Sequence, residues 1–373
     1  MSEETGARPS AEERVANAAS TASVKRAIER STEIEEQIDL DPSQFRMLTG
    51  DRPTGRLHLG HYFGTLKNRV ELQNRGVDTW ILVADYQVIT DRDVVGPLKE
   101  RVLGLVADYL ACGVDPERTT IFAHSGVPAL NQLMIPFLAL VTEAELHRNP
   151  TVKAESEATG GRALSGLLLT YPVHQAADIL FCKANIVPVG QDQLPHLELA
   201  RQIASRFDRR FGRANPDRPV FRRPDALLSE APLLLGTDGE KMSKSKGNTI
   251  ELGFTADETA KVLKKAKTDS DRFITYDPAT RPEVSNLLLL ASLATGEDPV
   301  LIAERIGDGG GGTLKAVVTE AVNEALAPIR ARRAELEKDP AYLESVLAAG
   351  TAKANEEADR TLLEVREAMQ MIY

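Results

Sequence analysis

The chain has 373 residues, of which 42% are hydrophobic and 27% charged, and its formal net charge is −10. This length predicts about two domains, and the composition is typical of a globular protein with a packed core. The negative charge excludes binding of nucleic acid by bulk attraction, so any RNA-binding surface must be local.

The sequence predicts a cytoplasmic protein without a membrane segment. No apolar run approaches the ~18 residues of a transmembrane helix, and the N-terminus has no apolar secretory segment. The only two cysteines, Cys112 and Cys182, form no CxxC pair. We therefore expect reduced thiols, no zinc or other metal held by the protein, and no organic cofactor.

Residues 1–44 differ from the rest because they are rich in Ala, Glu and Ser. This composition favours a mobile N-terminal extension. The alternative is one amphipathic helix over residues 24–38, with Val24, Ile28, Ile34 and Ile38 on one side, that docks on the protein or on a protein partner.

From residue 45 the sequence alternates between strand and helix patterns. Continuous apolar runs predict buried strands within 45–50, 78–90 and 118–128. Amphipathic patterns predict helices over 60–76 and 97–113. This alternation predicts a doubly wound, Rossmann-like parallel sheet.

The middle of the chain, residues 129–211, is predicted to be mostly helical, and the run 185–193 returns to the sheet. All patterns after residue 250 are helical, and the glycine-rich run 307–312 predicts a flexible joint. The predicted organisation is an extension over 1–44, a catalytic α/β domain over 45–250 that includes a helical insertion, and an all-helical domain over 251–373.

The stretch "RPTGRLHLGHYFG" follows the first predicted strand and opens a helix. Ligands of doubly wound sheets bind at the carboxyl ends of strands, and a helix N-terminus there offers free N–H groups. Gly60 lets a ligand approach the backbone, and His58 and His61 share one side of a helical turn. The pattern predicts a phosphate site, and the alternative is a surface turn whose histidines have no function.

A second stretch, "GTDGEKMSKSKGN" at 236–248, carries lysines at 241, 244 and 246. A lysine run is commonly a solvated loop. The chain has no GxxxxGK[ST] motif, nor GxGxxG after a strand. These two stretches are therefore the best candidates for binding a nucleotide.

"HLGH" at 58–61 and "KMSKS" at 241–245 resemble the two signature motifs of class I aminoacyl-tRNA synthetases. The resemblance implies ATP-dependent activation of an amino acid and its transfer to tRNA, with Mg²⁺ accompanying ATP. It implies catalytic roles for His58, His61, Lys241 and Lys244. The implied ATP site comprises Arg52, Pro53, Thr54, Gly60, His61, Gly190, Gln191, Asp192, Lys241, Met242, Ser243, Lys244 and Ser245.

Residues 167–207 are closely similar to the tryptophanyl-tRNA synthetases, and the resemblance extends over roughly 46–373. In that family the aspartate of "AADIL", here Asp178, accepts the indole N–H. On a helix Tyr171, Gln175 and Asp178 share one face. The implied tryptophan site comprises Asp178, Tyr171, Gln175, Gln193, Gln87, Val187, Val189 and Gly50. The structural alternatives are an Asp178 that bridges helices and valines that only fill the strand core.

The chain departs from the family at two positions. Gln175 stands where many tryptophan enzymes have Met, which reproduces a tyrosine-binding spacing, and Gln87 stands where some have His. These departures predict a pocket that handles tryptophan analogues differently and tolerates indole-containing inhibitors. Two alternatives remain, a tyrosine–tRNA ligase and a nucleotide-binding regulatory paralogue that does not charge tRNA.

The resemblance also implies partners. These are L-tryptophan, ATP, tRNA(Trp) read by the helical domain, and a second copy of the chain bound through helices between 129 and 180. The basic runs 264–267 and 328–338 are candidate RNA contacts or solvated faces.

Overall fold

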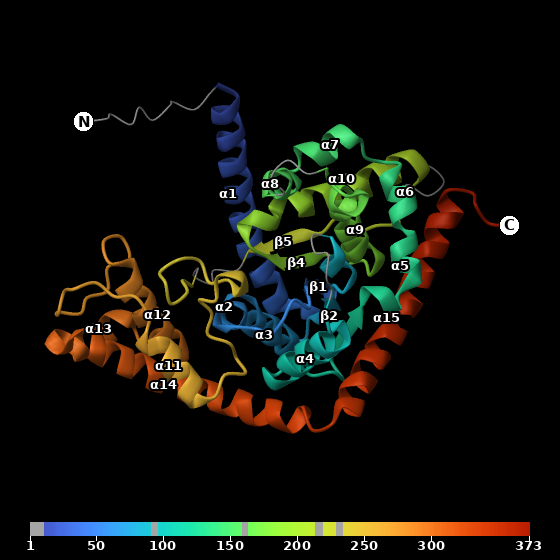
Figure 1. Cartoon of the computed structure of the whole chain (residues 1–373). Helices are drawn as coiled ribbons and strands as arrows, with labels where there is room; N and C mark the ends of the chain where they lie inside the picture. Colours follow the sequence, from blue (N-terminus) through green and yellow to red (C-terminus); the bar gives the residue numbers. More distant parts are fainter. Residues whose placement is uncertain (1–10, 91–95, 159–162, 213–218, 229–233) are drawn as a thin grey trace.

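The computed structural model describes residues 11–90, 96–158, 163–212, 219–228 and 234–373. A five-stranded parallel sheet lies at its centre (Figure 1). The strands are β1 (Arg46–Asp51), β2 (Asp78–Val83), β3 (Thr119–Ala123), β4 (Ile186–Val189) and β5 (Asp225–Leu228).

The α-helices, in chain order, are α1 (Ala11–Leu40), α2 (Leu59–His61), α3 (Lys67–Arg75), α4 (Leu98–Ala111), α5 (Pro128–Gln132), α6 (Met134–Leu138), α7 (Glu143–Arg148), α8 (Pro150–Ala158), α9 (Gly166–Phe181), α10 (Leu194–Phe211), α11 (Ala256–Lys264), α12 (Pro282–Thr295), α13 (Pro299–Ile306), α14 (Gly310–Leu336) and α15 (Pro340–Ala368). The described short turns are η1 (Pro42–Gln44), the π turn η2 (Tyr62–Leu66), η3 (Tyr86–Ile89), η4 (His124–Gly126), η5 (Gln191–Gln193), η7 (Lys244–Lys246) and η8 (Gly307–Gly309).

The strand order is β3-β2-β1-β4-β5, with all neighbours parallel. The predicted doubly wound sheet is therefore confirmed, and its topological switch lies between β1 and β4. Ligands of such sheets bind beside the carboxyl ends of the strands at this switch. Gly50, near the end of β1, pairs with Leu82, whose carbonyl oxygen lies 2.6 Å from the place that a Cβ on residue 50 would occupy. Glycine is thus required at this position.

Both faces of the sheet are buried, as expected of parallel strands. Ile81 and Ile121 belong to an apolar cluster on one face, which continues through α4 into α12 and α14. Trp80 and Phe122 belong to a cluster on the other face, formed with α5, α9, α10 and α15. The alternation of side chains along each strand distributes these residues between the two faces.

The edge strand β5 is covered by α1. Ile34 and Ile38 are fully buried against the sheet edge. Ser31 Oγ accepts from the backbone N–H of Leu228 at 2.9 Å and donates to the carbonyl of Ala226 at 3.2 Å. This contact corrects the expected mobile extension, because the part of residues 1–44 that contacts β5 is a docked helix that satisfies an exposed strand edge.

The opposite edge strand, β3, is covered by α15, which wraps along the side of the sheet (Figure 1). The closest approach is at Gly350, where a Cβ would lie 2.0 Å from the carbonyl oxygen of Ile121. Ala354 and Ala358, one and two turns later, are fully buried. Small residues on this face of α15 therefore let the helix lie directly on the strand.

We expect Gly350→Ala to lower the free energy of unfolding by about 3 kcal/mol, because the strand backbone cannot move away from the added methyl group. Urea unfolding measures the change. Gly312→Ala is the matched control, since Gly312 lies inside a helix with nothing within 4 Å of its Cβ position. That control should be neutral or stabilising, and equal effects at the two positions would contradict the tight contact.

The predicted helical domain over 251–373 is divided in the structure. Helices α11 to α14 pack together to one side of the sheet, whereas α15 returns to β3 and α5 (Figure 1). The glycine-rich run is also corrected, because residues 307–309 form a 3-10 turn and α14 begins at Gly310. Gly310 adopts a positive φ of 74°, which permits the sharp change of direction into the helix.

Among the described residues, no single helix is long and apolar enough to cross a membrane. The bent pair Pro282–Thr295 and Pro299–Leu336 passes that test jointly, by length and composition only.

Candidate active site

The turn between β1 and α2 brings the two predicted motifs into contact. The imidazole rings of His58 and His61 lie 3.8 Å apart, centroid to centroid, as their spacing predicted. From the lysine-bearing loop, Lys244 Nζ donates to the carbonyl oxygen of Gly55 at 2.9 Å. Arg52, Pro53 and Thr54 form the start of the same turn. Residues almost 190 positions apart in sequence thus form one cationic and imidazole-lined site.

The two segments are also joined by backbone hydrogen bonds. The N–H of Leu59 donates to the carbonyl of Ile250, and the N–H of Leu252 donates to the carbonyl of Leu57, each at 2.9 Å. His58 and Glu251 form the antiparallel bridge between these bonds. The chain that leaves the lysine loop is therefore fixed beside the histidines.

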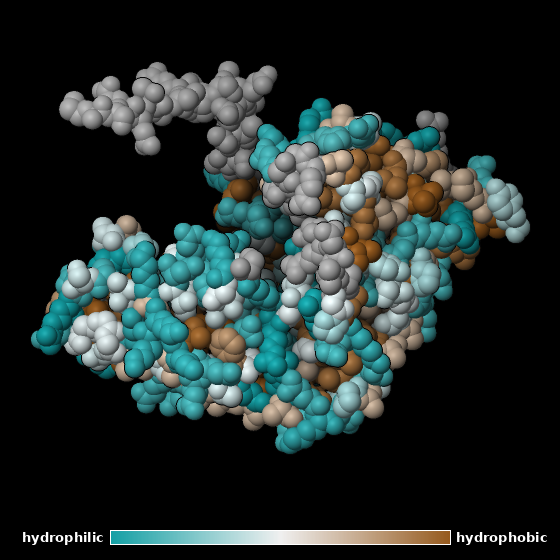
Figure 2. Space-filling view, viewed as in Figure 1, coloured by the Kyte–Doolittle hydropathy of each residue, from teal (hydrophilic) through white to brown (hydrophobic). Residues whose placement is uncertain are grey.

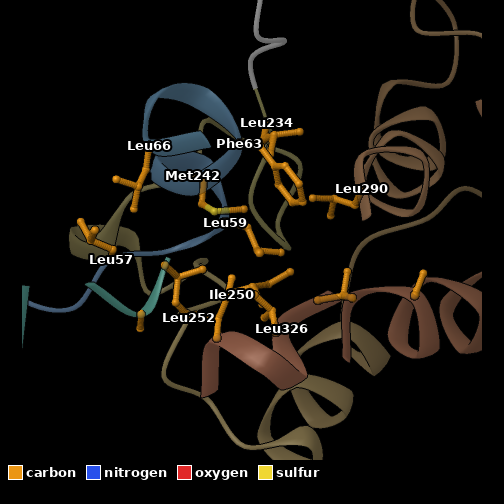
Figure 3. Close-up of a cluster of buried hydrophobic side chains, with 14 of the residues drawn as sticks. Leu57, Leu59, Phe63, Leu66, Leu234, Met242, Ile250, Leu252, Leu290 and Leu326 are labelled. Atoms are coloured by element: carbon orange, nitrogen blue, oxygen red, sulfur yellow. The ribbon is translucent and has the colours of Figure 1, made fainter. Parts of the chain in front are cut away.

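An apolar cluster lies behind this contact (Figure 3). Met242 is only 6% exposed and packs in it with Leu57, Leu59 and Ile250. The sequence analysis placed Met242 in the ATP site, whereas its buried side chain anchors the loop to the hydrophobic core. Lys241 on the same loop is exposed, and the side chain of Ser245 lies outside the described residues.

Asn248 organises the lysine loop and was not singled out from the sequence. Its side chain is 2% exposed. It donates to Asp238 at 2.8 Å and to the carbonyl of Lys241 at 3.2 Å, and it accepts from the N–H of Ser243 at 2.8 Å. Gly247 adopts a left-handed φ of 64° just before it. One amide therefore holds both ends of the lysine run, which leaves Lys241 and Lys244 on an ordered loop.

The imidazoles of this site are neutral at pH 7. Burial lowers the pKa of His58 to about 3, and repulsion of its protonated form by Lys244 and by a protonated His61 contributes to this shift. Burial also lowers the pKa of His61 to about 4; Asp51 opposes this shift, and Lys244 and Arg69 contribute to it. The buried Nδ1 of His58 has no hydrogen-bond partner in the described part. The site thus combines neutral imidazoles with the positive charge of Lys244, a donor set suited to phosphate oxygens.

The other predicted ligand residues gather at the carboxyl edge of the sheet. Gly50 is the second-last residue of β1, and Gln87 lies in η3, which follows β2 after two residues. Val187 and Val189 lie in β4 and belong to or pack against the core cluster of one face. The exposed Gly190, Gln191 and Asp192 and the half-buried Gln193 follow β4.

Asp178 is almost fully buried on α9, and its partner is His124, a residue that the sequence analysis missed. His124 Nε2 lies 2.7 Å from Asp178 Oδ1. The ring of His174 stacks on His124 with 4.4 Å between centroids. His124 directly follows β3, so the rule that ligands bind at strand ends was the signal that could have found it.

His124, His174 and Asp178 also offer ligand atoms that all lie within 4.8 Å of one another. Two histidines and one carboxylate are a donor set that zinc accepts. In this structure, however, His124 Nε2 and Asp178 Oδ1 bond directly to each other, so an ion held by these two atoms would have to replace that hydrogen bond.

The helix face predicted for tryptophan is divided between two clusters. Whereas Asp178 contacts His124, Gln175 Oε1 lies 2.6 Å from His196 Nδ1. Tyr171 lies beside the same His196, with 5.4 Å between ring centroids, and His196 Nε2 lies 2.8 Å from the hydroxyl of Thr151. Gln175 and Tyr171 therefore connect α8, α9 and α10, and only Asp178 faces the strand ends.

Acid should destabilise the fold through its buried histidines. Burial lowers the pKa of His196 to about 4, below the value of about 6.5 in an unfolded chain. The unfolded chain therefore binds more protons between these values, and stability falls as the pH is lowered from 6.5 toward 4. The variant His196→Gln retains hydrogen-bonding groups for Thr151 and Gln175 but does not titrate in this range. We expect its free energy of unfolding to fall by about 2 kcal/mol less than that of the wild type when the pH is lowered from 7 to 5. Urea unfolding at both pH values measures this, and equal losses would contradict it.

One arginine of the basic run 328–338 has a structural role. Arg333 on α14 is 5% exposed, and its Nε donates to Asp108 Oδ1 at 2.6 Å. Asp108 Oδ2 accepts from the N–H of Leu57, directly before the histidine motif, at 3.0 Å. A buried carboxylate thus connects the helical region to the site.

Comparison with known proteins identifies the family. The family model for class I tRNA synthetases of the tryptophan and tyrosine type matches residues 41–327. A tryptophan–tRNA ligase of Treponema pallidum is 42% identical over 339 residues, covering 87% of this chain and 96% of that protein. The chain belongs to the tryptophanyl-tRNA synthetase family.

Solved structures agree with this membership. Tryptophanyl-tRNA synthetase from Campylobacter jejuni, complexed with ADP and tryptophan, has a TM-score of 0.76 at 30% identity, covering 87% of this chain and all of that chain. A tyrosyl-tRNA synthetase from Archaeoglobus fulgidus, at 22% identity and a TM-score of 0.58, shares the fold. These similarities confirm two predictions, that the fold is of class I and that the chain is an aminoacyl-tRNA synthetase.

Proposed function

We propose that the chain activates L-tryptophan with ATP, forming tryptophanyl-adenylate and pyrophosphate, and then transfers tryptophan to tRNA(Trp). The observation that carries this proposal is the contact of Lys244 with the turn that holds His58 and His61, in a chain whose relatives are named tryptophan–tRNA ligases.

The chemistry of the first step suits this site. The carboxylate of tryptophan attacks the α-phosphorus of ATP, and pyrophosphate leaves from the opposite side. Negative charge increases on the phosphate oxygens, so catalysis depends on positioning and electrostatic stabilisation. Lys241 and Lys244 hold the leaving pyrophosphate, and His58, His61 and the backbone at Gly60 hold the α-phosphate region.

The remaining ATP contacts are Arg52, Pro53 and Thr54 at the turn and the backbone of residues 190–192 after β4. Mg²⁺ enters with ATP as part of the substrate. Lysines and neutral imidazole N–H groups are not oxygen ligands, so the phosphates themselves supply the ligands that Mg²⁺ prefers.

Tryptophan occupies the carboxyl edge between β1 and β4. Asp178 accepts the indole N–H, Gln193 contacts the ammonium group, and Gly50 and Gln87 border the substrate. Val187 and Val189 supply the apolar wall. Tyr171 and Gln175 support the site indirectly by holding His196, because their polar groups face that residue.

The helical region α11–α14 binds the anticodon of tRNA(Trp). In the two predicted basic runs, Lys264, Lys265 and Arg332 are exposed and are the candidate contacts, whereas Lys267 pairs with Glu283. Because charged tRNA is used in translation, we place the protein in the cytoplasm. The first turns of α1 project beyond the body of the molecule (Figure 1) and are the segment available to a protein partner.

A homodimer forms through helices between 129 and 180. Ile135 on α6 is 72% exposed, and Figure 2 shows hydrophobic surface in the region where Figure 1 labels α6, α9 and α10. We expect Ile135→Asp to convert a dimer into a monomer in light scattering, because a charge in a buried interface is costly. A wild-type monomer, or an unchanged dimer in the variant, would exclude this surface.

Charging of total tRNA with labelled amino acids tests the function. We expect labelled tryptophan, and not tyrosine, to become bound to tRNA in the presence of ATP. Tyrosine charging would favour the tyrosine–tRNA ligase, and nucleotide binding without any charging would favour the regulatory paralogue.

A further inference from the structure

The pair formed by His124 and Asp178 is the most deeply buried polar pair beside the proposed tryptophan site. His124 is 0% and Asp178 2% exposed. Their polar atoms are 2.7 Å apart. We take His124 Nε2 as the donor and the carboxylate oxygen Asp178 Oδ1 as the acceptor of this hydrogen bond.

The ring of His124 cannot rotate freely. His174 stacks on it, and His174 Nε2 is itself fixed by Asn131 Oδ1 at 2.7 Å. Tyr86 lies nearly parallel to His124, with 6.3 Å between centroids and 16° between planes. The donor is therefore held in one direction before any ligand arrives.

This arrangement has a consequence for Asp178. A carboxylate accepts through both oxygens, and one of them, Oδ1, is engaged by His124. The hydrogen bond fixes the plane of the carboxylate and leaves the second oxygen as an acceptor for a ligand donor. A buried acceptor that is left unpaired is costly, so a ligand that lacks the donor binds less well.

We propose that His124 is a positioning residue that makes Asp178 selective for an amino acid carrying an indole N–H. The inference rests on the proposed function, in which Asp178 receives that N–H. His124 acts only through Asp178 and touches no reacting atom.

Two variants of His124, each measured with two amino-acid substrates, test the inference. His124→Phe keeps an aromatic ring against His174 and Tyr86 but removes the donor, whereas His124→Gln retains an N–H at a similar reach. The amino acids are tryptophan and 3-benzothienylalanine, whose ring has the same shape with sulfur in place of the N–H. KM for each is measured by ATP–pyrophosphate exchange.

We expect His124→Phe to raise KM for tryptophan at least tenfold, the effect of losing a hydrogen bond involving a charged group. KM for benzothienylalanine and KM for ATP should stay within about twofold. His124→Gln should restore most of the discrimination between the two amino acids. If His124→Phe does not fold, His124→Asn, whose amide is too short to reach Asp178, should show the same pattern.

An equal increase of KM for both amino acids would indicate a general structural role and overturn the inference. So would a His124→Phe enzyme with unchanged KM for tryptophan. Failure of the wild-type protein to use tryptophan would instead overturn the proposed function, so the two failures are distinguishable.

Discussion

Lys244→Ala is expected to lower the rate of tryptophan-dependent ATP–pyrophosphate exchange by about 100- to 1,000-fold, the usual loss when one preorganised donor is removed from a developing charge. Lys244 is half-buried and its Nζ is held at the turn by the carbonyl of Gly55. The ammonium group is therefore positioned before ATP binds. The loss should appear mainly in kcat, because the charge on the phosphates increases in the transition state.

Lys246→Ala is the matched control in the same loop. Lys246 is exposed, and its Nζ bonds to the exposed Glu240 at 2.7 Å, away from the histidine turn. We expect less than about a threefold change, since surface pairs contribute little. Equal losses for the two variants would show that loop charge alone matters and would contradict the specific role of Lys244.

The second large effect is expected at Asp108, which bridges α14 to the histidine motif. Asp108→Asn removes the buried countercharge of Arg333 and leaves it only the half-exposed Glu337 as an acidic partner. Breaking a buried pair in this way costs up to about 3–5 kcal/mol. Urea unfolding measures the loss. We also expect a higher KM for ATP, because Asp108 accepts from the N–H of Leu57, adjacent to His58.

Two controls separate the buried charge from general damage. The double variant Asp108→Leu with Arg333→Met removes both charges and should recover much of the stability lost in Asp108→Asn. Glu335 lies on the same helix as Arg333 and forms an exposed pair with Lys338, just beyond the end of the helix. Glu335→Gln breaks this pair and should change stability by less than about 1 kcal/mol. A double variant less stable than Asp108→Asn would mean that the pair itself stabilises the fold.

The sheet was largely predictable because its central strands are continuous apolar runs. Strand β5 was not predicted, since Asp225–Leu228 has only four residues and no alternation that distinguishes it from a loop. Strand β5 pairs with β4, and its other edge is covered by α1, whose Ser31 bonds to the backbone of Ala226 and Leu228. Burial of α1 is in turn a tertiary effect, because among the side chains of α1 that the structure describes, those of residues 24–40, Ile34 and Ile38 are the ones that enter the core.

The site residues that could be predicted are those that lie within short sequence motifs. His58, His61 and Lys244 lie within short motifs, and the structure brings them together. The partnership of His124 with Asp178 spans 54 positions and that of Asp108 with Arg333 spans 225. No local pattern encodes such contacts. Asn248 was not predicted for another reason. An asparagine after a glycine is common in turns, and only the structure shows its three hydrogen-bond partners.

The central claim is that the turn holding His58 and His61 and the loop holding Lys241 and Lys244 enclose ATP beside a site for tryptophan. Amino-acid-dependent ATP–pyrophosphate exchange, measured with each of the protein amino acids in turn, tests it most directly. The account predicts exchange with tryptophan that far exceeds exchange with any other amino acid. Exchange with tyrosine instead, or with none of them, would contradict it.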